Sequence, residues 1–531
     1  MLPDRGVACD TRLHVTSKGA ATSPDRDDAR TAGRGGLAIA VAKVSFILVG
    51  FIQQLIFPRI LDEAGYGAVS RMLAVVSIIN NVVVAMSLQG VSRMVVQAPD
   101  AEKDAAVRKT LTVHLVIALI CSSAFALLAG TIANTLEAPR AANPLRVAAG
   151  VVLCYGVYAP LVGALNGKKR FLDQAGLDIF YGVSRTVAMT AAAWLFARFL
   201  GGDGALGAAV GFVAAAALIV PIAAWRNGIG RSGAGGPSTG EYLKFLLPLF
   251  AAQGGLNLLL QLDLLLLSEA SGEYARLLGM DDKEADKLLG PYRASQLFGF
   301  LPYQLLMSVQ FVLFPLLAKA SSEGDRAGVE RLTRGGMRLA FVLTGLIAGT
   351  ISALAPHLVR FAFPENIALQ AAPFVRVYTL GLSALAILGV ASSALASLRR
   401  ERWSMALTWV AAALVFGSIM VFRPSQSFGP ELLRATAYST AGAMVTAGVL
   451  AAVALWRAAG ALVRPLTLVR VFFAVAVVIA LGSQAPWLGK LLTPVLAIGV
   501  AVVYVVALIA TGEIGRADLE LVRAVLARRR A

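Results

Sequence analysis

Four basic residues fall inside long apolar runs of this sequence: Lys43, Arg185, Lys244 and Arg376. A charge at the centre of a membrane helix costs about 2.5–3.5 kcal/mol on insertion scales, so such a residue usually faces a cavity or a charged partner. Arg185 lies nearest the middle of its run, and Asp178, seven residues earlier, shares its helical face. Two interpretations stay open: Arg185 binds an anionic substrate, or it forms a structural ion pair with Asp178.

Five further basic side chains are weaker candidates for binding an anion. Lys43 lies seven residues into the first apolar run, and Arg376 lies near the end of a later one, so both side chains could extend to the membrane surface instead. Arg59, Arg71 and Arg293 lie where apolar runs begin or end. They could contact an anion at the rim of a cavity, or they could simply be solvated.

Uncharged polar residues and two acids also lie within the apolar runs. Amides at helical spacing either bind a polar ligand or hold helices together. Asp178 and Asp263 are candidate ligands for a cation, although Asp263, near a helix end, is expected to be an acid in water. The candidate amides are Asn80, Asn81, Gln253, Asn257, Gln261 and Gln304.

No motif for nucleotide hydrolysis or metal-dependent catalysis is present. The segment GALNGKK (163–169) lacks the spacing and the hydroxyl residue of a P-loop, and neither HExxH nor GxSxG occurs. The three cysteines and three histidines are widely scattered. We therefore expect no catalytic residue, no metal site, no cofactor and no direct use of ATP.

The composition is that of a membrane protein: 57% of the 531 residues are hydrophobic and 15% are charged. The apolar runs are too long for barrel strands of about 10 residues, so they predict an all-α polytopic protein with about fourteen transmembrane helices. The expected spans are 36–57, 68–92, 110–133, 147–166, 174–199, 205–225, 242–267, 294–318, 338–359, 372–397, 403–421, 435–456, 467–485 and 491–511.

Basic residues concentrate in alternate loops, which predicts the orientation. With the N-terminus in the cytoplasm, about 31 Lys and Arg fall in inside segments and about 13 outside. Lys168, Lys169 and Arg170 form one inside cluster. We therefore expect a multi-pass protein of the bacterial inner membrane with both termini cytoplasmic, and no nucleic-acid partner.

Two pairs of segments repeat at nearly one offset. GYGA (65–68) and GPYRA (290–294) each open a span, and GALNGKKR (163–170) and SALASLRR (393–400) each close one. Because each predicted unit has six spans, both halves keep one orientation and are related by a pseudo-two-fold axis along the membrane normal. We divide the chain into a disordered cytoplasmic tail (1–34), an N-terminal six-helix bundle (35–226), a cytoplasmic linker (227–240), a C-terminal six-helix bundle (241–458), two extra transmembrane helices (459–512) and a basic cytoplasmic tail (513–531).

Three segments carry a resemblance to a known family. FPRILDEAGYGAVSRMLAVVSIINN (57–81), GPYRASQLFGFLPYQLLMSVQFVLFPLLAKA (290–320) and LVRFAFPENIALQAAPFVRVYTLG (358–381) resemble turns and helices of the Wzx-like polysaccharide flippases. These belong to the multidrug/oligosaccharidyl-lipid/polysaccharide exporter superfamily, and the resemblance covers about residues 36–511. The acidic insert at 268–290 is longer than the family pattern.

The resemblance implies a V-shaped pair of bundles around a cavity and the flipping of an undecaprenyl-diphosphate-linked oligosaccharide. It implies membrane lipids, a polymerase and a chain-length regulator as further partners. The diphosphate would then bind to Arg185, Lys43, Arg59, Arg71, Arg293 and Arg376, and the sugars to the six amides named above.

Two other functions stay open at this point. A membrane polymerase or O-antigen ligase uses similar substrates, but it needs a large outer loop with catalytic groups, and the longest outer loop has no histidine. A cation-coupled drug exporter of the same superfamily is the second alternative.

Overall fold

The first lobe consists of six long helices and two 3₁₀ turns. In the computed structural model, which describes residues 24–233, 238–423 and 428–515, every regular element is a helix. The elements of the first lobe are α1 (Pro24–Ile60), α2 (Glu63–Gln97), η1 (Asp100–Glu102), α3 (Lys103–Thr135), η2 (Pro139–Ala141), α4 (Ala142–Gly167), α5 (Phe171–Phe199) and α6 (Gly204–Asn227). Local residues set where helices begin and end: Asp62 and Asp203 are the N-caps of α2 and α6, and two glycines with positive φ, Gly201 and Gly202, follow the end of α5.

The second lobe has more breaks than the first. Its helices are α7 (Thr239–Leu259), α8 (Leu262–Leu277), α9 (Asp282–Gly299), α10 (Leu301–Ser322), α11 (Arg326–Ala353), α12 (Ala355–Ala362), α13 (Glu365–Ser397), α14 (Glu401–Phe422) and α15 (Pro430–Ala459). Helices α7 and α8 form a pair bent by 51°. Two more helices, α16 (Pro465–Gly482) and α17 (Thr493–Ala510), follow and pack against α11.

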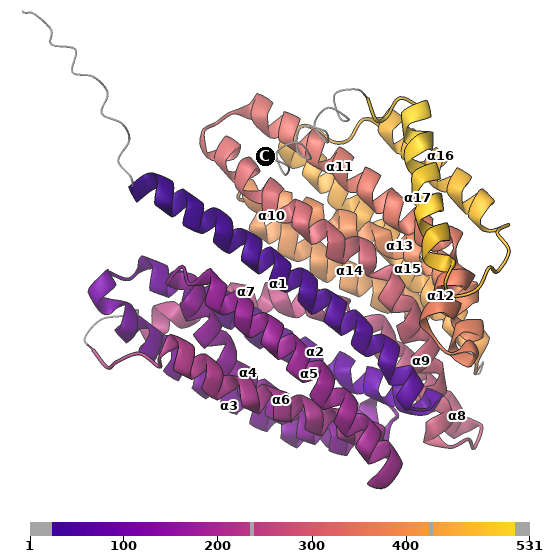
Figure 1. Cartoon of the computed structure of the whole chain (residues 1–531), viewed down its shortest axis with the longest axis horizontal. Coiled ribbons are helices and arrows are strands. Elements are labelled where there is room, and N and C mark those ends of the chain that lie inside the picture. The colour runs from indigo at the N-terminus through magenta and orange to yellow at the C-terminus, as the bar shows by residue number, and fades with distance from the viewer. Residues whose placement is uncertain (1–23, 234–237, 424–427, 516–531) are drawn as a thin grey trace, which may run out of the picture.

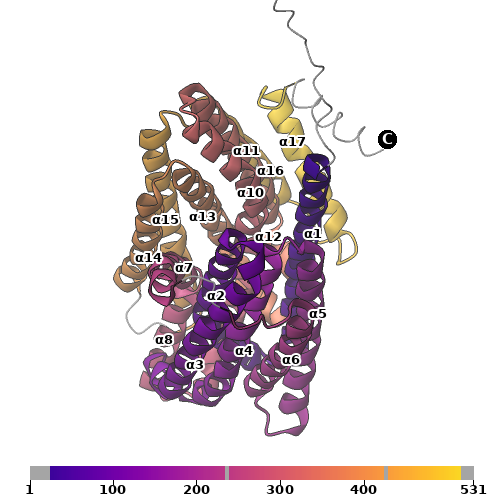
Figure 2. The same ribbon diagram turned by 90° about the vertical axis from the view of Figure 1, so that its left-hand side faces the viewer.

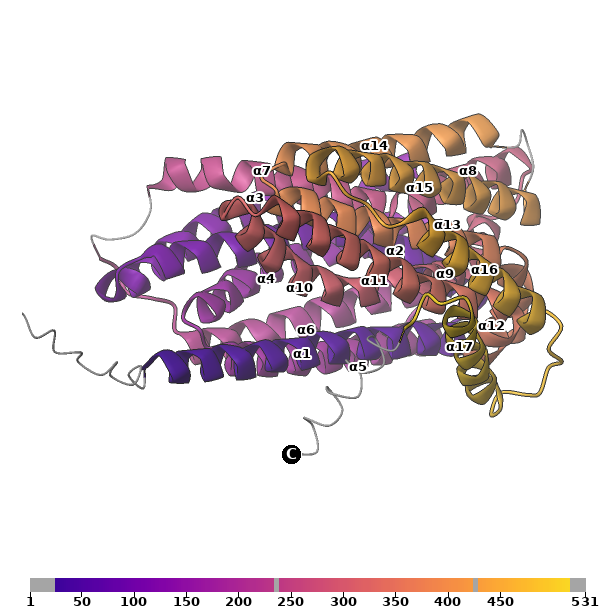
Figure 3. The same cartoon turned by 90° about the horizontal axis from the view of Figure 1, so that it is seen from above.

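The two lobes lie side by side, with the first lobe below the second in the view of Figure 1. Figure 2 shows α16 and α17 at the edge of the second lobe, on the side of α1. Figure 3 shows α1 and α5 running together along one edge of the first lobe, and α1 packs almost only on α5. The wall of the first lobe is therefore one helix thick at α1.

The number of spans is close to the prediction. Among the described residues, 12 helices are long and apolar enough to cross a membrane, or 13 if the bent pair of α7 and α8 is one span. The remaining predicted span, 294–318, falls on the end of α9 and on α10. Neither helix is among these 12 or 13 candidate spans. A break at Phe300 divides this segment into two helices.

Two predicted boundaries are wrong. The disordered tail was expected over 1–34, but α1 begins at Pro24, because the polar residues before the apolar run continue its helix; residues 1–23 lie outside the described part. The basic tail was expected from 513, but Glu513 is buried against α11 and α16 through its ion pairs. Residues 234–237 of the predicted linker and 516–531 of that tail also lie outside the described residues.

The opening motifs of the sequence repeat meet at the interface between the lobes. Tyr66 of α2 and Tyr292 of α9 are both fully buried. A Cβ atom at Gly290 would lie 3.2 Å from the ring of Tyr66, and one at Gly67 would collide with the carbonyl oxygen of Asp286. The backbones of α2 and α9 therefore touch, and glycine is required at Gly67 because no side chain fits there. The rotation that relates the two halves stays a prediction.

Candidate functional site

A cavity of about 510 Å³ lies between the lobes. Its lining comes from α1, α2, α4, α5 and α6 of the first lobe, and from α9, α10 and the break between α7 and α8 of the second. Eight predicted site residues line it: Lys43, Asn80, Asn81, Asp178, Arg185, Gln261, Arg293 and Gln304. The volume falls within the 300–1,000 Å³ range of small-molecule sites, so the cavity is large enough for one polar head group.

Arg185 of α5 lies on the cavity wall among aromatic rings. Its guanidinium carbon lies 4.7 Å from the ring centre of Phe46 and 5.9 Å from that of Phe212. Its Nη2 donates a long hydrogen bond of 3.5 Å to Gln53, and its Nε is buried without a hydrogen-bond partner. The guanidinium is thus held by cation–π contacts while donors stay open for an anion.

Asp178 pairs with Lys43 rather than with Arg185. The Nζ atom of Lys43 lies 3.9 Å from a carboxylate oxygen of Asp178, and Tyr158 donates a hydrogen bond of 3.4 Å to the other oxygen. Two helical turns separate Asp178 and Arg185, which is a rise of about 10 Å, too far for a direct pair. The predicted alternative of an Asp178–Arg185 ion pair is therefore wrong.

Three tyrosines of α4 and α5 form a packed aromatic wall beside Arg185. The rings of Tyr155 and Tyr181 meet edge-on at 5.2 Å, and those of Tyr155 and Tyr158 at 5.7 Å. Edge-on aromatic pairs add about 0.5–1.5 kcal/mol beyond their burial, so this wall is rigid. It packs α5, which carries both Arg185 and Asp178, against α4.

The second lobe supplies one cation and several amides. Arg293 of α9 lines the cavity and donates a hydrogen bond of 2.9 Å to Gln296. Gln261, at the break after α7, has a buried side-chain oxygen without a partner. The polar lining of the cavity therefore comes from both lobes. A motion of one lobe relative to the other would rearrange these polar groups.

The other predicted site residues do not line the cavity. Arg59 is exposed and bonds the carbonyl of Leu55, one turn before it on α1. Arg376 donates to the carbonyl of Ser352 at 2.8 Å, so it fastens α13 to α11. Within α7, the side-chain amide of Asn257 donates a hydrogen bond of 2.9 Å to the backbone carbonyl of Gln253, and its oxygen accepts one of 3.0 Å from Asn81 of the first lobe.

Asp263 is buried, so the expectation of a helix-end acid in water is wrong. Only 3% of its surface is exposed. One carboxylate oxygen accepts from Tyr292 at 2.8 Å and from Tyr378 at 2.7 Å, and the other accepts from Gln296 and the backbone of Leu264, both at 2.9 Å. Four donors thus stabilise the charge, and no ligand oxygen is oriented toward a cation.

Arg71 of α2 contributes to a buried contact between the lobes. It is 3% exposed, forms an ion pair with Asp286 of α9 and donates 2.6 Å to Ser268 of α8. Burial raises the pKa of Asp286, while Arg71 beside it acts to lower it. The expectation that Arg71 meets substrate at an open rim is wrong, because the acidic insert folds over it as α8 and α9.

More polar contacts between the lobes surround this pair. Arg140 of η2 lies 3.1 Å from Asp281, and Arg276 of α8 lies 3.3 Å from Glu137. Glu63 accepts hydrogen bonds of 2.6 Å from Gln370 and 3.3 Å from Asn366 of α13. We call these contacts and the Arg71–Asp286 pair the outer clamp, because they lie on the side that the charge distribution assigns to the outside.

Several polar cavity residues were not predicted. Gln53 accepts from both Arg185 and Thr186, the latter at 3.2 Å, and Gln174 and Ser77 also line the cavity. The pair of glutamines Gln53 and Gln54 within an apolar run was a signal that could have identified Gln53. No group of three His, Cys, Asp or Glu that could hold a metal occurs among the described residues.

The comparisons with known proteins agree with this fold. The family described as "Polysaccharide biosynthesis protein" matches residues 32–321, which is more than half of the chain. No curated protein sequence matches.

Two solved structures illustrate the similarity. The lipid II flippase MurJ in an inward closed conformation matches 88% of this chain and 97% of its own, with 14% identity and a TM-score of 0.67. An inward-facing multidrug resistance MATE family transporter of the MOP superfamily matches 79% of this chain and 98% of its own, with 14% identity and a TM-score of 0.63. The chain therefore belongs to the polysaccharide biosynthesis protein family and has the two-lobed, all-helical fold of the multidrug/oligosaccharidyl-lipid/polysaccharide exporter superfamily.

Proposed function

We propose that this protein flips an undecaprenyl-diphosphate-linked oligosaccharide across the bacterial inner membrane for cell-surface polysaccharide synthesis. The observation that carries the proposal is Arg185, a cation with an unpartnered donor on the wall of a cavity between two lobes. Family membership and the likeness to a lipid II flippase support it. The substrate would then be the lipid-linked glycan. A polymerase and a chain-length regulator would be the partners that act after it has been flipped.

The charges of the cavity suit a diphosphate. Lys43, Arg185 and Arg293 face it, against Asp178 as the single acid in its lining. Guanidinium groups offer planar sets of donors to phosphate oxygens, and an aromatic, water-poor wall strengthens such contacts. Asn80, Asn81, Gln261 and Gln304 would bind the sugar hydroxyls at the same time.

This excess of positive charge argues against the alternative of an exporter for cationic drugs. A cationic drug would be repelled by three basic groups, with only one acid to offset them. A polymerase or ligase would need catalytic groups near the substrate. The sequence of the acidic insert is folded instead into the contacts of α8 and α9 with the first lobe.

Transport would proceed by alternating access without ATP. In this mechanism the outer clamp opens while the opposite end closes, and an ion gradient or the membrane potential shifts the balance.

The test is a flipping assay in vesicles that contain the purified full chain and a fluorescent undecaprenyl-diphosphate sugar. Arg185→Ala should reduce the flipping rate by about 10- to 100-fold, since a hydrogen bond to a charged group contributes about 1.5–3 kcal/mol. Arg198→Ala is the matched control, because Arg198 is exposed at the end of the same helix and does not line the cavity. Equal rates for both variants, at equal protein levels, would refute the proposal.

A further inference from the structure

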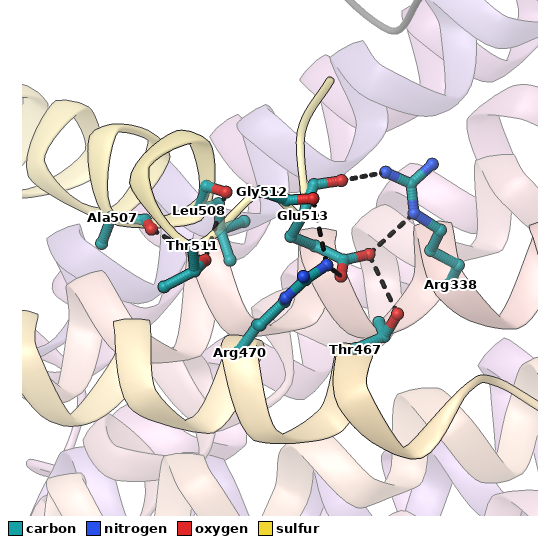
Figure 4. A network of polar contacts seen from close by, with 8 residues as sticks. All are labelled: Arg338, Thr467, Arg470, Ala507, Leu508, Thr511, Gly512 and Glu513. Atoms are coloured by element: carbon teal, nitrogen blue, oxygen red, sulfur yellow. Dashed lines mark hydrogen bonds and ion pairs between the residues drawn. The ribbon is translucent and has the colours of Figure 1, made fainter.

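A second pocket, of about 450 Å³, lies where α11, α16 and the end of α17 meet. Figure 4 shows the polar contacts of Glu513 with Arg338, Thr467 and Arg470 in its lining. None of these helices lines the central cavity, so the two sites are separate. The second pocket is strongly basic, with five arginines and one acid, Glu513, in its lining. The arginines are Arg331, Arg334, Arg338, Arg464 and Arg470.

Glu513 already forms ion pairs with two of the five arginines, Arg338 and Arg470. Nε of Arg338 lies 2.8 Å from Oε1, and Nη1 of Arg470 lies 3.4 Å from Oε2. Thr467 donates a further hydrogen bond of 3.0 Å to Oε1, and the glutamate side chain is 3% exposed. The acid therefore fixes two arginines in place and leaves no capacity to neutralise the others.

Three arginines of the pocket have no ion pair with any residue that the structure describes: Arg331, Arg334 and Arg464. On α11 the spacing of three and then four residues puts Arg331, Arg334 and Arg338 on one face, where like charges repel. The side chains of Arg331, Arg334 and Arg464 are exposed, so water screens part of this repulsion, and an anion bound among them would relieve the rest. The arrangement of these arginines therefore favours the binding of a multivalent anion.

The backbone at the start of α16 also favours the binding of an anion. Arg464 precedes α16, and Leu466 and Thr467 of its first turn line the pocket. The free N–H groups and the dipole at a helix N-terminus attract anions, and phosphate groups in particular. In the first turn of α16, Pro465 has no N–H group and the N–H of Thr467 donates to the carbonyl of Arg464 at 3.0 Å, so the contribution comes mainly from the helix dipole.

The position of the pocket relative to the membrane indicates which molecule would supply the anion. Helices α16 and α17 are each 18 residues long and apolar enough to cross a membrane. Arg464 and Glu513 lie just beyond their ends, which is the level of the lipid head groups. Basic pockets between transmembrane helices at this level bind phosphorylated head groups.

We propose that this pocket is a phosphate-binding site for the head group of an acidic phospholipid. The guanidinium groups of Arg331, Arg334 and Arg464 bind the phosphate oxygens, and Glu513 holds Arg338 and Arg470 in position behind them. Free inorganic phosphate offers the same chemistry, so the experiment has to distinguish the two sources.

The experiment measures binding to the purified full chain by native mass spectrometry with phosphatidylglycerol, and by calorimetry with inorganic phosphate. The pocket variant is Arg331→Gln/Arg334→Gln/Arg464→Gln, and its lipid affinity should fall by about 100-fold, since each basic residue near the membrane surface contributes roughly a fivefold factor. The matched control is Arg399→Gln/Arg400→Gln/Arg402→Gln, which removes three exposed arginines elsewhere. A Lys variant at the same three pocket positions, which keeps the charge, should recover part of the affinity.

Loss of phosphatidylglycerol binding in the pocket variant, but not in the control, would support the proposal. The same pattern with inorganic phosphate and no preference for lipid would identify free phosphate as the ligand of the site. Equal binding by the wild type and the pocket variant, with both eluting as folded protein, would overturn it. Partial recovery by the Lys variant shows that the loss reflects charge rather than misfolding.

Discussion

The carboxylate of Asp178 lies 3.9 Å from Nζ of Lys43, while Arg185, two turns further along the same helix, packs on the ring of Phe46 at 4.7 Å. The two charges of α5 therefore have different partners. The acid neutralises a lysine near the mouth of the cavity, where the side chain of Lys43 is 54% exposed. Arg185 keeps its charge available to a ligand.

This relationship predicts how a double mutant behaves. Removing Asp178 should not rescue Arg185→Ala, because the two side chains do not form a pair. The Asp178→Ala/Arg185→Ala protein should flip substrate as poorly as Arg185→Ala, and Arg185→Lys should retain part of the activity. Complementation of surface polysaccharide, with protein levels measured, checks both. Normal export by the double mutant would show that Arg185 is structural.

A second prediction concerns the outer clamp. Breaking a buried ion pair by removing one partner costs about 3–5 kcal/mol, so Arg71→Ala should weaken the closed state. A cysteine at Ser77, inside the cavity, should then react at least about tenfold faster with an impermeant reagent from outside.

Two variants control for the outer-clamp experiment. Arg140→Ala removes an exposed pair, with 57% and 54% of the two side chains accessible, and should change the labelling rate little. Arg71→Met/Asp286→Leu should restore closure, because well-packed apolar residues can replace a buried pair. Unchanged labelling in Arg71→Ala would mean that the pair does not hold the lobes together.

The third prediction concerns the orientation in the membrane, which the structure leaves as a prediction. In a protein whose native cysteines are replaced by alanine, Leu278→Cys should label from outside and Gly240→Cys only from inside. Both positions are exposed, and a Cβ at Gly240 meets nothing within 4 Å. Gly272, another position in the acidic insert, is unsuitable because a side chain there would collide with Glu137. Labelling of Gly240→Cys from outside would invert the arrangement.

The fourth prediction concerns the stability of the second lobe. Asp263→Ala should leave three buried donors without an acceptor, those of Tyr292, Tyr378 and Gln296, at about 1–3 kcal/mol each. Tyr378→Phe removes a single hydrogen bond and should cost only about 1 kcal/mol. Thermal unfolding of the purified proteins compares them. An Asp263→Ala protein as stable as Tyr378→Phe would contradict the hydrogen-bond network.

The sequence predicted the helices well because a span of about 20 apolar residues is a local signal. It predicted Arg185 and Lys43 as cavity residues for the same reason, since a charge inside an apolar run needs a polar environment. It could not predict that Arg71 binds Asp286, more than two hundred residues away. Nor could it predict the burial of Asp263, whose carboxylate accepts hydrogen bonds from side chains of α9 and α13.

The second pocket shows a different limit. The helical spacing of Arg331, Arg334 and Arg338 was visible in the sequence, but it matched the ordinary pattern of a basic cytoplasmic segment. Only the packing of α16 and α17 against α11 brings Arg464, Arg470 and Glu513 to the same place. A site made by three distant helices has no local signature.

The single-helix wall at α1 has a consequence for the length of any lipid carrier. One face of α1 presents Lys43, Phe46 and Gln54 to the cavity, while Val44, Leu48 and Ile52 are about half exposed on another face. A helix with its side chains is only about 10–12 Å across, so a head group beside α1 is one helix width away from the hydrocarbon around the protein. A tail could remain in that hydrocarbon throughout transport, and the protein would then be indifferent to how many isoprene units the carrier contains.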